Sequence, residues 1–249
     1  MPTVTVSKRG ADRVRQGHLW IYRSDLLDTA GVAGGSVVTV KDQKGNFVGQ
    51  AFFSDSSEIS LRLLTQTDEL IDREWWRRRL LAAASRRATI TADTNAYRLV
   101  YSEGDLLPSL IIDRYDDVFV MQTLSQGSEA IKTLISELLV EEFAPRAIIE
   151  RNDVKVRSLE GLDLIAGNLF GTAPEELEIL QHGLRFLVAP LAGQKTGSFL
   201  DQRENRLAAR NLAHGLGLDC FTFNGAFALH LASVCEQVTG IDISAEAIE

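Results

Sequence analysis

The feature that most constrains the fold is a pair of apolar runs near the end of the chain, separated by a glycine turn and a helical pattern. Residues 216–223 and 238–243 are apolar enough for buried strands, and residues 227–235 repeat apolar side chains at helical spacing. The order strand, glycine turn, helix, strand predicts the first βαβ unit of a doubly wound sheet.

Three residues of this unit have the chemistry of a nucleoside site. Gly225 in the turn has no side chain, so the backbone there can approach a ligand. Asp242 ends the second strand, where a carboxylate can accept hydrogen bonds from both ribose hydroxyls. A single glycine gives little support for pyrophosphate binding, so S-adenosylmethionine (SAM) fits better than NAD, and Asp219 can face its amino-acid end. A plain structural βαβ unit remains the alternative.

A second concentration of functional residue types lies just before this unit, from Gly193 to Arg206. A structural loop rarely needs glycines, amides and both charge signs together, and the spacing is not that of a Walker loop. The alternative is an ordinary capped helix over residues 201–214, in which Asp201 is the cap and Glu204 follows three residues later.

The rest of the chain divides into two further regions, which gives domains at 1–70, 71–176 and 177–249. The first is expected to be a small β-barrel, with strands at 4–6, 36–40, 47–53 and 59–64 and a helix at 10–16. The second is expected to be an α+β domain, with helices at 72–89 and 128–142 and strands at 97–102, 110–114, 118–124 and 147–151. The third opens with a hairpin at 178–188 that turns at His182-Gly183.

The charge distribution indicates a restricted contact with nucleic acid. A net charge of −8 argues against a protein that coats nucleic acid indiscriminately. The N-terminal residues are locally basic, and His18 or Trp20 could stack on a base, although barrel packing is equally consistent. The arginines between Arg73 and Arg87 can form either a solvated helix face or an RNA-facing one.

Other residues indicate structural roles and a compartment. Cys220 and Cys235 lie in apolar segments without zinc spacing, so both are expected in the core of a cytoplasmic protein without a metal. Trp75 and Trp76 are expected in interdomain packing. The histidines at 182, 214 and 230 are expected at the surface, at a helix end and on a helix face. No apolar run is long enough for a membrane span.

The run from Gly193 to Arg206 resembles the signature of the PUA-containing class I RNA methyltransferases that make 5-methylcytosine in large-subunit ribosomal RNA. The resemblance covers essentially the whole chain. Residues 17–22 and 60–64 resemble the PUA barrel, residues 98–115 and 151–161 resemble the central α+β domain, and residues 219–227 with Asp242 resemble the cofactor motif.

The resemblance implies a PUA-like barrel, a central α+β domain and an incomplete Rossmann-like domain, with SAM as cofactor and 23S rRNA as partner. A homodimer is compatible with it. The implied cofactor residues are Lys195, Thr196, Gly197, Phe199, Asp201, Gln202, Arg203, Asp219, Phe221, Asn224, Gly225 and Asp242. The implied RNA-binding residues are Lys8, Arg9, Arg13, Arg15, His18, Trp20 and Arg62.

The sequence departs from the family pattern in three respects. Ser109 stands where a glycine is usual, and Asn224-Gly225-Ala226 replaces a Thr-Gly-Gly type of turn. The family's Asp-Pro-Pro loop and catalytic cysteine are expected beyond Glu249, so no catalytic residue is assigned and this chain is expected to be inactive and its last segment unstable. A non-enzymatic RNA-binding module is therefore the alternative function.

Overall fold

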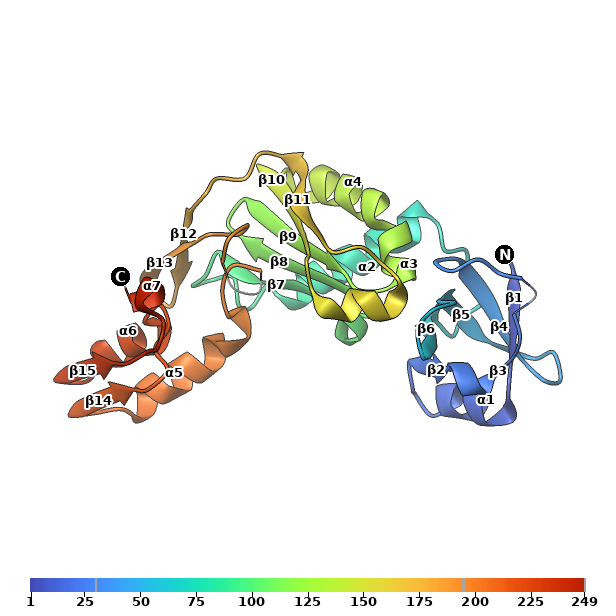
Figure 1. Cartoon of the computed structure of the whole chain (residues 1–249), viewed down its shortest axis with the longest axis horizontal. Coiled ribbons are helices and arrows are strands. Elements are labelled where there is room, and N and C mark those ends of the chain that lie inside the picture. Colours follow the sequence, from blue (N-terminus) through green and yellow to red (C-terminus); the bar gives the residue numbers. More distant parts are fainter. Residues whose placement is uncertain (30, 194–195, 249) are drawn as a thin grey trace.

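The computed structural model describes residues 1–29, 31–193 and 196–248. Three parts follow one another in a row, with the N-terminal barrel at one end, a five-stranded sheet in the middle and the βαβ unit at the other end (Figure 1). Among the described residues, no helix is long and apolar enough to cross a membrane.

The N-terminal part is a six-stranded mixed sheet in the order β2-β6-β5-β4-β1-β3. Its elements are β1 (Thr3–Val6), α1 (Lys8–Arg15), β2 (Trp20–Tyr22), η1 (Arg23–Asp25), β3 (Leu26–Asp28), β4 (Val37–Asp42), β5 (Phe47–Phe53) and β6 (Ile59–Thr65). The four expected strands and the expected helix are confirmed. Strands β2 and β3 were not predicted, because three residues are too few to show an alternating pattern.

Strands β5 and β6 are buried on both faces, which explains why their apolar residues run without alternation. Phe53 and Leu63 point into the core of the barrel, whereas Phe52 and Leu64 belong to the core of the central domain. The barrel therefore uses the outer face of these two strands to pack on the next domain.

The central domain is a five-stranded sheet in the order β11-β10-β9-β8-β7. Its elements are α2 (Arg73–Arg86), β7 (Ala96–Tyr101), η2 (Ser102–Asp105), β8 (Leu110–Tyr115), β9 (Val118–Thr123), α3 (Gln126–Ala130), α4 (Lys132–Phe143), β10 (Ala147–Asn152), η3 (Lys155–Glu160) and β11 (Ile165–Gly171). Strands β9 and β10 are parallel, and α3 and α4 form the crossover between them. The expected single helix at 128–142 is divided at Ile131, and β11 was not predicted.

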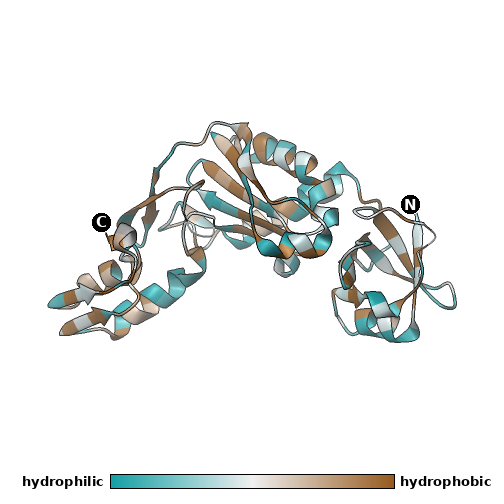
Figure 2. Ribbon diagram, in the orientation of Figure 1, coloured by the Kyte–Doolittle hydropathy of each residue, from teal (hydrophilic) through white to brown (hydrophobic). Residues whose placement is uncertain are grey.

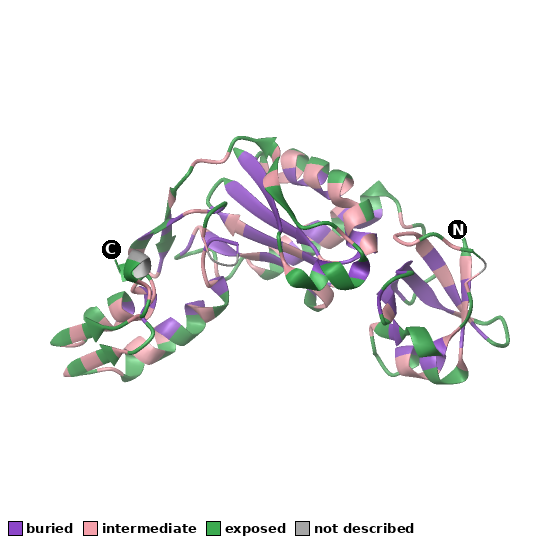
Figure 3. Ribbon diagram, in the orientation of Figure 1, coloured by how far each residue is buried: buried purple, intermediate pink, exposed green. Residues whose placement is uncertain are grey.

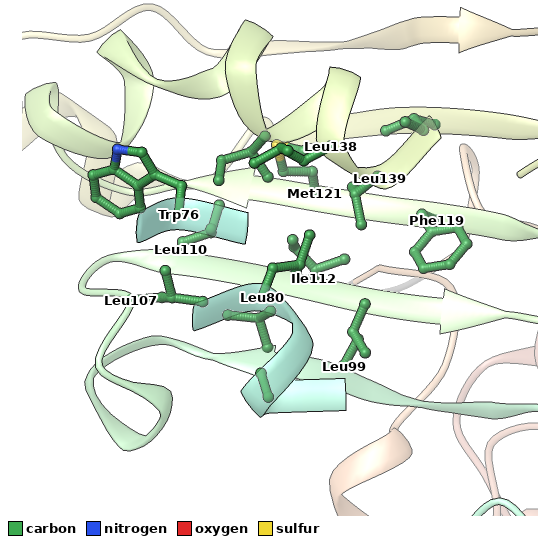
Figure 4. Close-up of a cluster of buried hydrophobic side chains, with 14 of the residues drawn as sticks. Trp76, Leu80, Leu99, Leu107, Leu110, Ile112, Phe119, Met121, Leu138 and Leu139 are labelled. Carbon is green, nitrogen blue, oxygen red and sulfur yellow. The ribbon is translucent and has the colours of Figure 1, made fainter. Parts of the chain in front are cut away.

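The strands of the central sheet are rich in apolar residues (Figure 2). One face of the sheet is covered by α2 and α4, whose apolar side chains pack against it (Figure 4). Trp76, Leu80 and Leu138 pack against Ile112 and Met121 of the strands. Trp76 also stacks on Phe52 of the barrel, with ring centroids 5.5 Å apart. The prediction of interdomain packing is confirmed for this tryptophan.

The other face of the central sheet is covered by residues from the last third of the chain. Ile179 and Phe186 come from the hairpin formed by β12 (Leu177–Gln181) and β13 (Leu184–Val188), and they pack against Val120 and Ile149. The hairpin itself is confirmed, with its turn at His182 and Gly183. The division at 176/177 stays a prediction, because this packing joins the two segments.

The C-terminal part is the expected βαβ unit. It contains η4 (Leu200–Gln202), α5 (Arg203–Leu212), β14 (Leu216–Asp219), α6 (Ala226–Ala232), β15 (Gln237–Gly240) and α7 (Ala245–Ile248). Strands β14 and β15 pair in parallel, which confirms the prediction. The predicted cap at Asp201 is wrong, because a 3-10 turn precedes α5 and its N-cap, Gln202, makes no side-chain cap hydrogen bond.

The C-terminal unit is the least buried part of the molecule (Figure 3). Leu216 and Leu218 of β14 are exposed because no further strand or helix covers their face of the two-stranded sheet among the described residues. For the same reason Cys220 is exposed and Cys235 is only partly buried. The prediction that Cys220 is a core residue is therefore wrong for this structure.

Candidate cofactor and RNA sites

The carboxylate of Asp242 connects the two loops that follow β14 and β15. Its Oδ2 accepts a hydrogen bond from the backbone N–H of Phe223 at 2.8 Å, and its Oδ1 accepts one from Ser244 at 2.9 Å. These N–H groups lower the pKa of Asp242, so the carboxylate is ionised near neutral pH. Each oxygen keeps lone pairs for a further donor.

The turn between β14 and α6 needs Gly225 for its conformation. Gly225 has φ +76°, a left-handed geometry that a side chain disfavours. Asp219 accepts the N–H of Ala228 at 3.0 Å and so fixes the start of α6 against the end of β14. At Gly240 a Cβ would lie 2.8 Å from Thr222 Oγ1, so the two loops approach closely because this residue is glycine.

A cavity of about 630 Å³ lies between this turn and the hairpin. Its lining includes Asn224 and Gly225, which were both predicted to bind the cofactor. Thr222 also lines it, and its buried hydroxyl has no hydrogen-bond partner. Phe221, in contrast, is 90% exposed and outside the cavity lining. The turn therefore lines a cavity in which the Thr222 hydroxyl is available to hydrogen-bond a ligand.

The first half of the 193–206 run is bound to the central sheet. Thr196 is buried and donates to Asp113 Oδ2 at 2.6 Å, while Tyr115 Oη accepts the N–H of Ser198 at 3.0 Å. Gly197 has φ +131° beside the Tyr115 ring, another conformation that favours glycine. The predicted cofactor residue Lys195 lies outside the described residues.

The second half of the run faces the hairpin and the βαβ unit. The guanidinium of Arg203 pairs with Asp93 at 2.5 Å, and Gln202 accepts a hydrogen bond from Asn205. The ring of Phe199 contacts that of Phe223 edge-on, with centroids 6.0 Å apart. Asp201 is exposed. Of the predicted residues in this run that the structure describes, Phe199 is thus the one with a ring contact to the cofactor turn, and the cofactor roles of all of them stay predictions.

A pair of histidines joins the hairpin to α6. His182 Nδ1 lies 3.2 Å from His230 Nε2, and His230 Nδ1 lies 2.7 Å from the carbonyl oxygen of Ala226. That carbonyl requires His230 to donate from Nδ1, so His230 Nε2 must accept from His182. His230 is fully buried and the His182 side chain is 3% exposed, so the prediction of a surface position for His182 is wrong.

We expect this histidine pair to make the free energy of unfolding fall as the pH drops below about 6.5. Burial lowers the pKa of both rings, and the positive charge of Arg203 adds to the effect at His182. The unfolded chain then binds more protons than the native one in this range, so stability is lost on acidification. Urea unfolding midpoints at pH 7.5 and 5.5 should show a smaller difference in His230→Phe than in the exposed control His214→Asn. Equal differences would contradict the prediction.

The predicted RNA-binding residues separate into two groups. Lys8, Arg9 and Arg13 line one hollow on α1, and His18 and Trp20 line the next one. Arg9 and Arg13 also pair with Asp25, whereas Arg15 and Arg62 line neither hollow. Arg15 pairs with Asp42 at 2.8 Å and with Asp12 at 3.1 Å.

Arg62 is buried and pairs with Glu160 at 2.7 Å. This ion pair lies in the joint between the barrel and the central domain, where Arg62 neutralises a buried acid of the chain itself.

Several arginines of α2, and Arg87 just after it, are also paired with acids of the chain itself. Arg73 contacts Glu137 and Glu141, each at 2.6 Å, and Arg87 contacts Asp105 at 2.5 Å. These contacts connect α2 to α4 and to η2. They favour the solvated-face interpretation of this helix over the RNA-facing one.

Three residues of structural importance were not singled out as site residues: Glu103, Asp113 and Glu160. Each falls only within the ranges 98–115 and 151–161 that resemble the family's central domain, and their partners lie far away in sequence, as with Glu103 and Trp20 or Glu160 and Arg62. The sequence signal that could have identified them is an acidic residue within a short turn or within an apolar strand. Among the described residues, no group of His, Cys, Asp or Glu could hold a metal ion.

Comparison with known proteins identifies the barrel and relates the whole chain to methyltransferases. Residues 4–66 match a family model described as a PUA-like domain. The chain is 36% identical over its full length to ribosomal RNA large subunit methyltransferase I of Klebsiella pneumoniae subsp. pneumoniae, and 37% identical over 93% of its length to that of Erwinia tasmaniensis. It spans 64% and 60% of the lengths of these relatives.

Two solved structures share the fold. One, a protein assigned as a methyltransferase and crystallised with SAH, superposes with a TM-score of 0.81 at 20% identity. The other, a protein from Streptococcus mutans assigned as SAM-dependent, superposes with a TM-score of 0.80 at 21% identity. Both cover the whole of this chain, which spans 64% and 65% of theirs. The chain therefore carries an N-terminal PUA-like domain, and its full length has the fold of the corresponding part of these structures.

Proposed function

We propose that the protein carrying this chain is a SAM-dependent methyltransferase that forms 5-methylcytosine in 23S rRNA. The observation that carries the proposal is the loop cavity next to Asp242, in a chain whose first domain is PUA-like. The names of the relatives, ribosomal RNA large subunit methyltransferases, support the reaction class and the type of RNA.

The residues around the cavity fit SAM. A volume of about 630 Å³ lies in the range of small-molecule sites. Asp242 would accept hydrogen bonds from the ribose hydroxyls, Thr222 offers an unpaired hydroxyl, and Phe223 provides an apolar wall for the adenine. Bound SAM would supply an electrophilic methyl group on its sulfonium. Lacking a pyrophosphate, it does not need the three glycines of a dinucleotide turn.

We expect calorimetry to detect binding of SAM and SAH to this chain, and Asp242→Asn to weaken it about tenfold or more, since hydrogen bonds to a charged group contribute about 1.5–3 kcal/mol. The matched control is Glu236→Gln, an exposed acid immediately before β15, at the opposite end of this strand. NAD should not compete. Absence of SAM binding, or equal competition by NAD, would refute the proposed cofactor.

The product is tested separately, in cells. Bisulfite sequencing of 23S rRNA should show one 5-methylcytosine that disappears when the gene is deleted and returns with the intact gene. An unchanged pattern would contradict methylation at C5. RNA binding by the chain without any SAM binding would instead support the alternative, a non-enzymatic RNA-binding module.

A further inference from the structure

A pocket lies at the seam where the barrel meets the central domain. Trp20 of β2 donates a hydrogen bond from its indole Nε1 to Glu103 Oε1 of η2 at 2.9 Å. The pocket has a volume of about 350 Å³. It is lined by Gln16, Gly17, His18, Leu19, Trp20 and Glu103. It therefore combines an aromatic surface from one domain with a carboxylate from the other.

A basic hollow adjoins this seam pocket along α1. The hollow has a volume of about 520 Å³ and shares Gln16 with the pocket, so the two adjoin at this residue. Three of its lining residues are cations (Lys8, Arg9 and Arg13), and one is an acid (Asp12). The side chain of Arg9 is 62% exposed although it pairs with Asp25. The basic hollow could bind RNA phosphates, while the aromatic ring of Trp20 in the adjoining seam pocket could stack on a base.

We propose that the seam pocket binds an unpaired guanine base of RNA, with the adjoining phosphates on the basic hollow of α1. This inference rests on the proposed RNA substrate, and it adds Glu103 as the residue that selects the base. Single-stranded RNA is commonly recognised by stacking of a base on an aromatic ring and by hydrogen bonds to its Watson–Crick edge.

The hydrogen bonds of Glu103 explain why guanine is the base. An ionised carboxylate can only accept hydrogen bonds, and it has about four positions for them. Oε1 receives the indole of Trp20, and Oε2 receives the hydroxyl of Ser102, so each oxygen can accept one more. Guanine presents two adjacent donors, N1–H and N2–H, that match two carboxylate oxygens. Cytosine and adenine place a ring-nitrogen acceptor beside their amino group, and uracil places carbonyl oxygens on both sides of its N3–H.

Trp20 provides the stacking surface and also a specific signal. The chain has three tryptophans, of which Trp20 is 38% exposed, whereas Trp75 and Trp76 are 1% and 3% exposed. A base stacked on Trp20 should quench its fluorescence. The other two are shielded in the core of the central domain, so quenching by RNA reports on the seam pocket.

The test is a fluorescence titration of the chain, without SAM, with four RNA pentamers that are all uridine except for a central G, A, C or U. We expect the G pentamer to quench tryptophan emission and to bind about tenfold or more tightly than the others, as a bidentate base contact does. In Glu103→Gln, whose amide can still accept from Trp20, the preference for G should disappear while binding of the all-uridine pentamer is kept.

Two controls separate base selection from electrostatics and from misfolding. Glu58→Gln changes an exposed acid elsewhere on the barrel and should leave the preference for G intact. Lys8→Gln should weaken all four pentamers alike and reduce the salt dependence, by a slope of about 0.7 for each phosphate that the protein no longer neutralises. An unchanged melting temperature of Glu103→Gln shows that the joint is preserved.

Equal affinities for the four pentamers, or a preference for G that survives Glu103→Gln, would overturn the inference. RNA that fails to quench Trp20 in a chain that still binds SAM would overturn it too and leave the proposed function standing. Selective quenching by the G pentamer in a chain that binds no SAM would support the guanine pocket and overturn the proposed cofactor.

Discussion

Replacing Arg62 with methionine is expected to lower the free energy of unfolding by about 3–5 kcal/mol, which is the usual cost of leaving one partner of a buried ion pair without the other. The side chains of Arg62 and Glu160 are 9% and 1% exposed, and their charged atoms lie 2.7 Å apart. Methionine has a similar length but no charge, so the Glu160 carboxylate would stay buried with only neutral donors. Urea unfolding followed by circular dichroism measures the loss.

The effect should be large because Glu160 is the centre of the joint between the barrel and the central domain. Its Oε2 also accepts hydrogen bonds from Ser54 Oγ at 2.8 Å and from the backbone N–H of Gln126 at 3.3 Å. The side chain of Gln126 in turn donates to Asp55 of the barrel at 2.8 Å. The barrel, α3 and η3 therefore meet at a single carboxylate, and the seam pocket lies along the same joint.

Two further variants test whether the loss comes from the unpaired buried charge. Arg62→Met/Glu160→Leu removes both charges and should recover most of the stability, since an apolar pair can replace a buried ion pair at little cost. Arg73→Met is the matched control, because its ion pairs with Glu137 and Glu141 are exposed and should contribute less than about 1 kcal/mol.

The stabilised double variant also tests the prediction that Arg62 contacts RNA. If Arg62 is structural, the double variant should bind RNA pentamers as the unmodified chain does. Weaker RNA binding by this well-folded variant would show that Arg62 contributes to RNA binding. A single Arg62→Met variant as stable as the Arg73→Met control would show that the joint does not depend on this ion pair.

The fold was largely predictable because its apolar patterns are local. The strands at 47–53 and 59–64 and the βαβ order are visible in the sequence as runs and periods. What could not be predicted depends on contacts between distant segments. Whether an arginine faces RNA or an acid depends on residues such as Glu137, which lies 64 positions after Arg73.

The same limit applies to the candidate site. The position of Asp242 after the second strand follows from the βαβ pattern, and the structure agrees with it. Gly225 was predicted because the backbone there could approach a ligand, which stays a prediction; the structure adds that its left-handed φ also favours glycine. Burial of His182 and His230 could not be predicted, because it arises only when the hairpin packs against α6. The predicted burial of Cys220 was wrong because its apolar run indicates a core segment, whereas among the described residues nothing packs over this side of β14.

The central sheet and the 193–206 run are joined at Asp113, which has two separable partners. Its carboxylate accepts two hydrogen bonds from Arg98, at 2.8 and 3.0 Å, and one from Thr196 at 2.6 Å. Asp113 is fully buried. Burial and the negative charge of Asp113 raise the pKa of Tyr115, whose phenol stays protonated beside Thr196 and Ser198.

Asp113→Asn is expected to lower the free energy of unfolding by about 3–5 kcal/mol, because it leaves the partly buried guanidinium of Arg98 without its counter-charge. Asp117→Asn is the matched control, since this acid is exposed in the turn after β8 and should change stability little. Urea unfolding of the two variants gives the comparison. A loss no larger than that of the control would show that the Arg98–Asp113 pair does not stabilise the sheet.

Thr196→Val measures the contribution of the loop without disturbing the Arg98–Asp113 ion pair, because it removes only the hydroxyl that bonds to Asp113 and Tyr115. We expect the cost in stability to be about 1–3 kcal/mol, and faster amide hydrogen exchange over residues 196–202 with little change in β8. Since Phe199 of this loop contacts Phe223 of the cofactor turn, SAM binding should weaken as well. A freed loop with unchanged SAM affinity would mean that the run serves to join the domains and does not shape the cofactor site.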